Sequence, residues 1–197
     1  MKPEEIFDTL RKQFSDSALL DFDGTVKSPF IRVAPDHFTS VMRFLRDAPG
    51  LAFDYLQLIT AVDWIEYFEV VYHLYSMKQG HKIAVKVKVP RENPVIPSVT
   101  SLWPAADWHE REQYDLMGVI FEGHPDLRRI LCPEDWEGHP LRKDYVQPVE
   151  YHGISNVRQA RDDWYPKPDE DAKAIITKPP QLKSPPSSTA SPDSKNP

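Results

Sequence analysis

The chain has almost no cysteine and no long apolar run. One cysteine, Cys132, stands among 197 residues, which excludes a disulfide within the chain, and a single thiolate cannot hold an iron–sulfur cluster by itself. A membrane-spanning helix needs about 20 consecutive apolar residues, and no stretch of the sequence approaches that length. Residues 1–16 carry too much charge for a secretory signal peptide. We therefore expect a chain of a reducing compartment whose association with any membrane is indirect.

An excess of positive charge is also absent. The formal net charge is −6 at pH 7, and no stripe of lysine and arginine is present that could bind a phosphate backbone. This balance argues against a nucleic-acid partner. The length is sufficient for one domain with a sizeable hydrophobic core.

Hydrophobic periodicity predicts an α+β fold, with helices packed on a small mixed or antiparallel sheet. Two helices are expected, at residues 3–14 and from Pro35 to just before Pro49. A hairpin with one solvated face is expected to turn at Gln79-Gly80. The other expected segments are a strand at residues 30–33, strand or mixed structure at 53–63, hairpin strands at 67–76 and 81–89, and the start of a short helix at 98–102.

Three parts are expected along the chain: a compact α+β domain at residues 1–117, an extended arm at 118–160, and a disordered Pro/Ser-rich tail at 161–197. The arm follows neither the strand nor the helix period, so it cannot bury a core of its own. Its large apolar side chains are costly to expose, which predicts that it lies on another protein. The expected interface residues are Trp136, Leu141, Arg142 and Tyr145.

A densely charged run at residues 110–128 contains the most specific pattern of the chain. If Trp108 to Met117 form a helix, the acidic residues at 110 and 112 lie in its first turn, where the macrodipole favours them. Asp115 is then placed to pair with Arg111 four residues earlier, and Gly118 is suited to a left-handed cap. The expected apolar side of this helix and its extension comprises Trp108, Leu116, Met117, Val119 and Phe121.

The spacing of Glu110-Arg111-Glu112, Asp115, His124 and Arg128 resembles the signature of the 30 kDa subunit family of respiratory complex I, the NADH:quinone oxidoreductase. The resemblance covers roughly residues 30–158. Two pieces after the helix are alike, Gly123-His124-Pro125-Asp126-Leu127-Arg128 and Gly138-His139-Pro140-Leu141-Arg142.

This resemblance implies a structural subunit of an NADH dehydrogenase, without catalytic residues or a cofactor of its own. The subunit would sit in the peripheral arm of complex I, at its quinone-reducing module and on the cytoplasmic face of the bacterial cell membrane. Its implied neighbour is the 49 kDa subunit, while other subunits hold the flavin, iron–sulfur clusters and quinone and translocate protons. Related membrane-bound hydrogenases and formate-linked or ferredoxin-linked oxidoreductases contain the same family and remain an alternative.

Three enzymatic alternatives arise from the residues themselves. Asp21 and Asp23 sit in a stretch that looks like the nucleophile motif of haloacid-dehalogenase phosphatases, although the strand–helix alternation of that fold is missing. The competing interpretation is an acidic turn before the strand at residues 30–33. A zinc site would draw on His109, Glu110, Glu112, His124, Asp135 and His139, but these lack the helical spacing of paired ligands. That missing spacing favours ion pairs with Arg111, Arg128 and Arg129, and histidines that fix turns. Cys132 beside His124 or His139 lacks an orienting third group, so a buried or interface thiol is expected instead.

Overall fold

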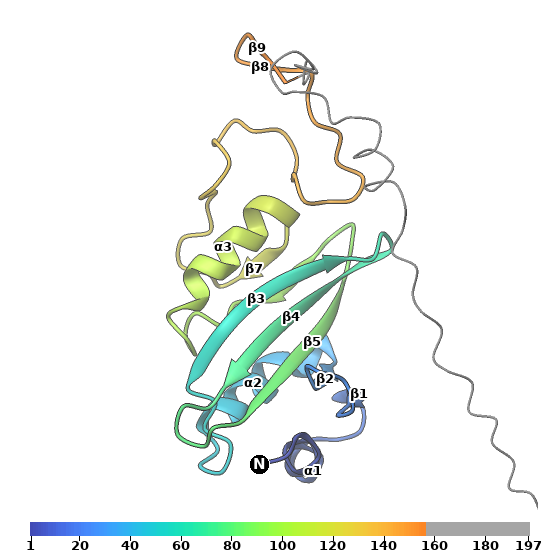
Figure 1. The fold of residues 1–197 in the computed structure, drawn as a ribbon, viewed down its shortest axis with the longest axis vertical. Coiled ribbons are helices and arrows are strands. Elements are labelled where there is room, and N and C mark those ends of the chain that lie inside the picture. The colour runs from blue at the N-terminus through green and yellow to red at the C-terminus, as the bar shows by residue number, and fades with distance from the viewer. Residues whose placement is uncertain (157–197) are drawn as a thin grey trace, which may run out of the picture. The chain divides into compact units, whose positions relative to one another are not determined.

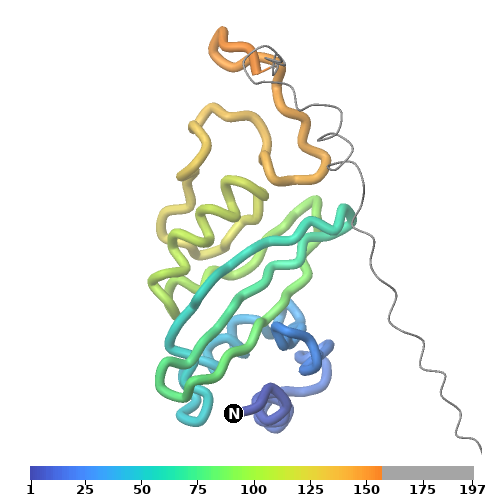
Figure 2. The backbone as a smooth tube through the Cα atoms, viewed as in Figure 1, coloured from blue at the N-terminus to red at the C-terminus, as the bar shows by residue number. Residues whose placement is uncertain are grey.

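A computed structural model of the chain describes residues 1–156, which fall into a compact unit of residues 1–147 and the first part, residues 148–156, of a second unit. Figures 1 and 2 show the course of the backbone. The elements of the first unit are α1 (Pro3–Gln13), β1 (Leu19–Asp23), β2 (Phe30–Val33), the 3-10 helix η1 (Pro35–His37), α2 (Phe38–Asp47), β3 (Tyr55–Asp63), β4 (Tyr67–Tyr75), β5 (Lys82–Pro90), β6 (Val95–Pro97), α3 (Ala106–Met117) and β7 (Ile120–Glu122).

A five-stranded sheet organises the first unit, with the strand order β1-β2-β5-β4-β3. The β2–β5 pair is parallel and the other neighbours are antiparallel, so the sheet is mixed. The helix α2 covers one face of the sheet, whereas α3 lies beside the edge strand β3 (Figure 1). Gln113 of α3 accepts a hydrogen bond from the backbone N–H of Ala61 at 2.9 Å, which satisfies a donor on that edge. The predicted α+β class is confirmed.

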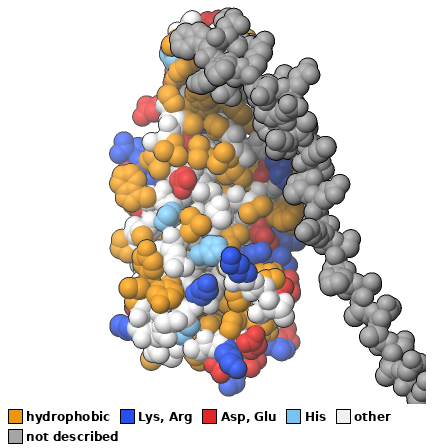
Figure 3. Space-filling view, viewed as in Figure 1, with side chains coloured by type: hydrophobic (Ala, Val, Ile, Leu, Met, Phe, Trp, Pro, Cys, Tyr) orange, Lys and Arg blue, Asp and Glu red, His pale blue; other side chains and the backbone are white. Residues whose placement is uncertain are grey.

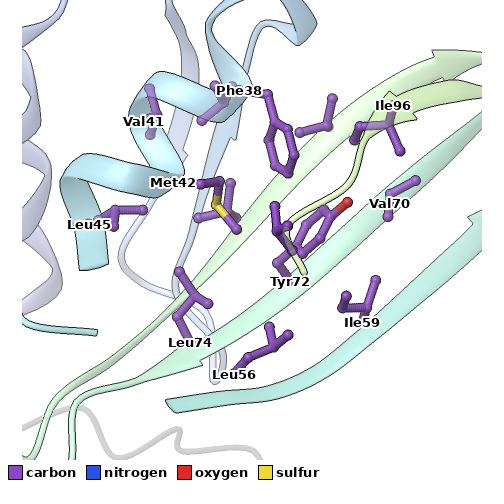
Figure 4. Close-up of a cluster of buried hydrophobic side chains, with 14 of the residues drawn as sticks. Phe38, Val41, Met42, Leu45, Leu56, Ile59, Val70, Tyr72, Leu74 and Ile96 are labelled. Atoms are coloured by element: carbon purple, nitrogen blue, oxygen red, sulfur yellow. The ribbon is translucent and has the colours of Figure 1, made fainter. Parts of the chain in front are cut away.

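The core lies between α2 and the sheet, and alternation in the strands explains it. Phe68, Val70, Tyr72 and Leu74 of β4 are all fully buried on one face, as their period of two requires. The predicted apolar face of α2 packs onto them (Figure 4). Burying one such large side chain stabilises a fold by roughly 1.5–3 kcal/mol. The core residues of α2 are Phe38, Val41, Met42 and Leu45.

The opposite face of the hairpin is less solvated than predicted. Glu69 and Val71 of β4 are buried on it. Glu69 forms ion pairs with Arg32 at 3.1 Å and with Lys86 at 3.5 Å, and the Lys86 ammonium lies 3.8 Å from the centre of the Phe30 ring. Long basic side chains therefore lie along the sheet and cover their shorter neighbours.

Two local predictions were wrong. Residues 98–102 form a turn rather than the start of a helix, because the N–H groups of Leu102 and Trp103 both donate to the carbonyl of Val99 and Pro104 follows at once. The acidic stretch with Asp21 and Asp23 is not a turn but the strand β1, which pairs antiparallel with β2.

The first unit extends beyond the predicted boundary at residue 117, since residues 118–147 belong to it. Within them β7 pairs in parallel with β6. The second unit opens with a small hairpin of β8 (Glu150–Tyr151) and β9 (Ile154–Ser155), so residues 148–156 are not simply extended. The end of the predicted arm and the predicted tail at 161–197 lie outside the described residues. Within residues 1–156, none of the helices combines the length and the apolar character that crossing a bilayer requires.

Candidate functional site

The helix α3 begins two residues earlier than predicted, at Ala106, and ends as predicted at Met117 with Gly118 in the left-handed region at φ 74°. Its last carbonyl groups have no partners within the helix, as at any helix end. The segment that follows the helix supplies hydrogen-bond donors to these carbonyl groups. His139 Nδ1 donates to the Asp115 carbonyl at 2.9 Å, the N–H of Leu141 to Leu116 at 3.0 Å, and Arg142 Nε to Met117 at 2.7 Å.

The cationic side chain of Arg142 is well placed at this helix end, because the macrodipole is negative there. Its guanidinium carbon also lies 5.2 Å from the centre of the Phe68 ring of the core. The side chain is therefore half-buried between the helix end and the sheet. Arg142, predicted as an interface residue, has a structural role within the chain.

Gly118 is required at this junction because its backbone is left-handed and because a side chain would have no room. Comparing alanine at Gly118 with alanine at Gly80 separates the two effects. A Cβ would meet the Arg142 guanidinium and the His139 ring, and φ is positive; Gly80 has a similar φ of 69° with open space around it. We expect Gly80→Ala to cost about 1–2 kcal/mol, the conformational penalty alone, and Gly118→Ala to cost about 1–3 kcal/mol more. Urea unfolding of both variants measures the difference. An equal decrease in the free energy of unfolding for both variants would show that the His139 and Arg142 side chains move aside at no cost.

Asp115 is the centre of the site. Its side chain is fully buried, and one carboxylate oxygen accepts hydrogen bonds from three consecutive backbone N–H groups, those of Ile130, Leu131 and Cys132, at 3.1, 2.7 and 2.8 Å. The other oxygen accepts from Arg129 at 2.7 Å. Burial, the largest influence, raises the pKa of Asp115, but the hydrogen bonds outweigh it and the pKa is lowered.

The predicted pairing of Asp115 with Arg111 is therefore wrong. Arg111 lies instead over the ring of Trp108, with its guanidinium carbon 5.0 Å from the ring centre, and donates to the carbonyl of Arg128 at 3.4 Å. Three adjacent N–H groups and the guanidinium of Arg129 hold the carboxylate more firmly than the single guanidinium of Arg111 could. Trp108, predicted on the apolar side, is 63% exposed.

Glu110 is fully buried and does not lie in the first turn. With the helix beginning at Ala106, the first-turn acid is Asp107. Glu110 accepts hydrogen bonds from Ser98 Oγ at 2.6 Å and from the N–H of Val99 at 2.7 Å, so it fixes the turn that precedes the helix. Burial raises its pKa to about 7, against the lowering effect of these two hydrogen bonds. Glu112 is half-buried on the same helix.

His124 lies at the other end of α3 with its side chain fully buried, 3.0 Å from the Asp107 carboxylate. Its Nδ1 accepts from the N–H of Asp126 at 3.0 Å, which leaves Nε2 as the nitrogen that carries the proton. Nε2 donates to the Asp107 carbonyl at 3.3 Å. Arg128 is exposed and pairs with Asp126 at 2.9 Å. The six signature residues are thus spread along one helix and its flanks and do not form one network.

The repeated Gly-His-Pro pieces have parallel roles. Gly123 and Gly138 both adopt left-handed backbone, at φ 82° and 76°. Each is followed by a histidine whose ring contacts a backbone carbonyl of α3, His124 at residue 107 and His139 at residue 115. The similarity of the two pieces is the sequence signal that could have identified His139. Arg129 was among the expected ion-pairing arginines, and it pairs with Asp115.

The predicted interface residues differ in exposure. Leu141 is 59% exposed, whereas Trp136, Arg142 and Tyr145 are half-buried. Leu131 and Val146 in the same segment are 62% and 85% exposed. The segment therefore keeps apolar surface outward although hydrogen bonds fix its backbone to α3.

The enzymatic alternatives find little support in the geometry. Asp21 pairs with Arg32 at 2.7 Å and Asp23 accepts hydrogen bonds from Thr25, on an antiparallel edge strand rather than the parallel strand of a phosphatase. Among residues 1–156, no three His, Cys, Asp or Glu side chains are grouped so that they could hold a metal ion. Cys132 is half-buried, and burial raises the pKa of its thiol, which disfavours the reactive thiolate.

Comparison with known proteins identifies a family for the chain. Residues 31–151 match the family described as respiratory-chain NADH dehydrogenase, 30 Kd subunit. An NADH-quinone oxidoreductase subunit of Chlorobium phaeobacteroides is 47% identical over 152 residues, which cover 75% of this chain and 91% of that protein. The corresponding subunit of Roseiflexus castenholzii is 52% identical over 117 residues, covering 58% of this chain and 67% of that protein.

Two solved structures share the fold. A trypsin-resistant fragment of Nqo5 is 32% identical with a TM-score of 0.54, covering 64% of this chain and 100% of the fragment. A component of a membrane-bound sulfane sulfur reductase, an archaeal respiratory membrane complex, is 29% identical with a TM-score of 0.61, covering 74% of this chain and 86% of that one. The family inferred from the spacing of the signature residues is confirmed: the chain belongs to the family of the 30 kDa subunit of respiratory NADH dehydrogenase (complex I).

Proposed function

We propose that this chain is a non-catalytic, cofactor-free structural subunit of the peripheral arm of a proton-translocating NADH:quinone oxidoreductase. At the quinone-reducing module it holds the 49 kDa subunit and helps to fix the geometry in which electrons pass from NADH to quinone. The flavin, iron–sulfur clusters and quinone belong to other subunits. The chain lies peripherally on the cytoplasmic face of the bacterial membrane.

One observation carries the proposal: the segment after α3 has a fixed backbone and an outward apolar surface. Three residues of α3 receive hydrogen bonds from residues 139–142, and Asp115 receives three more from residues 130–132. Leu131, Leu141 and Val146 remain more than half exposed. A surface ordered before binding loses less entropy on docking, which favours a role as a binding surface over one as a loose linker.

A second function has its own support. The sulfane sulfur reductase component shows the same fold in another respiratory complex, so an equivalent subunit of a hydrogenase or of a ferredoxin-linked or formate-linked complex is the alternative. The electron-input subunit distinguishes the two. Purification of the tagged chain from its native membranes with an NADH-binding flavoprotein supports complex I, and purification with a hydrogenase or ferredoxin-binding subunit supports the alternative.

Truncations and substitutions test residues 130–146, which we call the binding segment. We expect a cut after Tyr165, beyond the described residues, to leave association with the 49 kDa subunit intact, and Trp136→Ala or Leu141→Ser to weaken it. A cut after Met117 should abolish it, but this cut also removes Val119 and Phe121, which are buried in the core. The two point variants therefore provide the sharper test, measured by co-purification of the 49 kDa subunit.

Met77→Ser is the matched control, because Met77 is 68% exposed on the turn between β4 and β5, outside the binding segment. Thermal unfolding of each variant checks that the fold is retained. Co-purification at wild-type yield for both Trp136→Ala and Leu141→Ser would contradict the proposed role of the segment and move the interface elsewhere on the chain.

A further inference from the structure

The turn between β3 and β4 holds an unusual backbone. The N–H of Trp64 donates to the Tyr67 carbonyl at 3.0 Å and closes the turn. Ile65 lies within it at φ 72°, a left-handed conformation that a β-branched residue rarely adopts. Tight hairpin turns normally place Gly, Asn or Asp at such positions. Ile65 therefore adopts this conformation at an energetic cost. Strained backbone of this kind clusters at functional sites.

The conformation is held by the carboxylate of Asp63. This side chain is almost fully buried and accepts hydrogen bonds from the N–H of Ile65 at 2.7 Å and the N–H of Lys143 at 2.9 Å, and it forms an ion pair with Arg91. Burial alone would raise the pKa of Asp63, but Arg91 and the two N–H groups lower it to about 2. Arg91 in turn pairs with Asp144 at 2.6 Å. The turn is therefore rigidly bound to the segment around residue 143.

Two large apolar side chains project from this rigid turn. Trp64 is 52% exposed and Ile65 is 64% exposed. Basic groups accompany them, since Lys143 Nζ lies 5.9 Å from the centre of the Trp64 ring and Lys88 Nζ lies 4.4 Å from that of Tyr67. Figure 3 shows one face of the molecule, where apolar side chains are scattered among charged ones. We call the pair Trp64 and Ile65 the Trp64–Ile65 knob.

We propose that the Trp64–Ile65 knob inserts into an apolar socket, rimmed by carboxylates, on another protein subunit. Tryptophan is prominent among residues that dominate binding energy, and acidic groups on the rim would complement Lys88 and Lys143. This partner rests on the proposed function, because it is taken to be a subunit of the same respiratory complex.

A protein socket fits the turn better than a lipid surface does. A bilayer accepts apolar side chains in many conformations, so it would not require a strained and fixed backbone. A shaped socket binds a fixed backbone more tightly, because the side chains are oriented before binding and less entropy is lost.

Exchanging Ile65 separates docking from folding. Asparagine tolerates the left-handed conformation, so Ile65→Asn keeps the turn and removes the apolar side chain. We expect the thermal midpoint of the isolated chain to stay constant or rise, while the yield of co-purified complex falls about tenfold, as for a moderate hot spot. Trp64→Ala should show the same loss, and Met77→Asn, on the opposite hairpin turn, should show none. Wild-type yield with both knob variants would overturn the proposal.

A photo-crosslinking residue at position 64 tests the partner's identity in the full complex, with the same residue at position 77 as control. A crosslink from position 64 to one respiratory subunit, lost in the Ile65→Asn background, supports the socket. Crosslinks to lipid, or Trp64-dependent binding of the chain to phosphatidylglycerol vesicles, would overturn it in favour of the membrane. If the wild-type chain co-purifies with no respiratory subunit at all, the proposed function fails; if it co-purifies without regard to position 64 or 65, only the knob fails.

Discussion

Replacement of Asp115 by alanine is expected to destabilise the chain by about 3–5 kcal/mol, the cost of removing one member of a buried, hydrogen-bonded charge pair. The carboxylate satisfies three backbone N–H groups and Arg129. Without it, the segment at residues 130–132 has lost its acceptor and each unsatisfied buried donor costs about 1–3 kcal/mol. Because this segment leads into residues 139–142, we also expect the cap on α3 to loosen.

Arg128→Ala is the matched control for this experiment. Arg128 shares the signature spacing with Asp115, but its side chain is 65% exposed and pairs with an exposed aspartate. Such pairs contribute about 0.2–1 kcal/mol. Urea denaturation should therefore show decreases in the free energy of unfolding that differ severalfold between the two variants. Hydrogen exchange should show the loss of protection in Asp115→Ala at residues 130–142. Comparable losses would mean that the signature acts as one unit after all.

The second large effect is expected from the pH dependence of Glu110. Its pKa is about 7 in the folded chain against an ordinary value of 4.5, so the folded state binds this proton more tightly than the unfolded state does. Ionisation of Glu110 therefore costs stability as the pH rises from 4.5 to 7, and the penalty persists above that range. With about 1.4 kcal/mol for each tenfold change in proton affinity, the total loss is about 3 kcal/mol.

Glu110→Gln isolates this contribution from that of other titrating groups. A glutamine carbonyl can still accept from the N–H of Val99, and the Ser98 hydroxyl can rotate to accept from the amide. We expect the stability of the variant, relative to the wild type, to increase by about 3 kcal/mol between pH 4.5 and 7, measured by chemical denaturation at several pH values. A constant difference across this range would show that Glu110 ionises normally.

Local patterns predicted the fold well because its elements depend on local chemistry. The apolar face of α2, the alternation in β4 and β5 and the left-handed cap at Gly118 all follow from spacing along the chain. The strand β1 was missed since its two aspartates favour a turn, while in the structure Arg32 of the neighbouring strand neutralises Asp21. That neighbour is a tertiary contact, which propensity does not contain.

The candidate site was predictable as a region but not in its pairings. Four of the six signature residues lie on α3, yet Asp115 accepts hydrogen bonds from Arg129 and from three N–H groups more distant along the chain rather than from the nearby Arg111. The rule for residues four apart describes an isolated helix, whereas α3 is enclosed by the sheet and by the segment that follows it. Likewise the exposure of Trp108 depended on which side of α3 meets β3, and spacing alone does not show that.

The parallel pairing of β2 with β5 imposes an order on how the protein is made. β2 ends at Val33 and meets its partner only at Lys82–Pro90, so the five-stranded sheet cannot close until β5 has been synthesised. Contacts between such distant segments are slow to form. The residues that cap α3 are translated later still, which means that the binding segment reaches its final shape only on a finished sheet. If that segment binds a partner as proposed, binding during translation would be delayed until the sheet and α3 have folded.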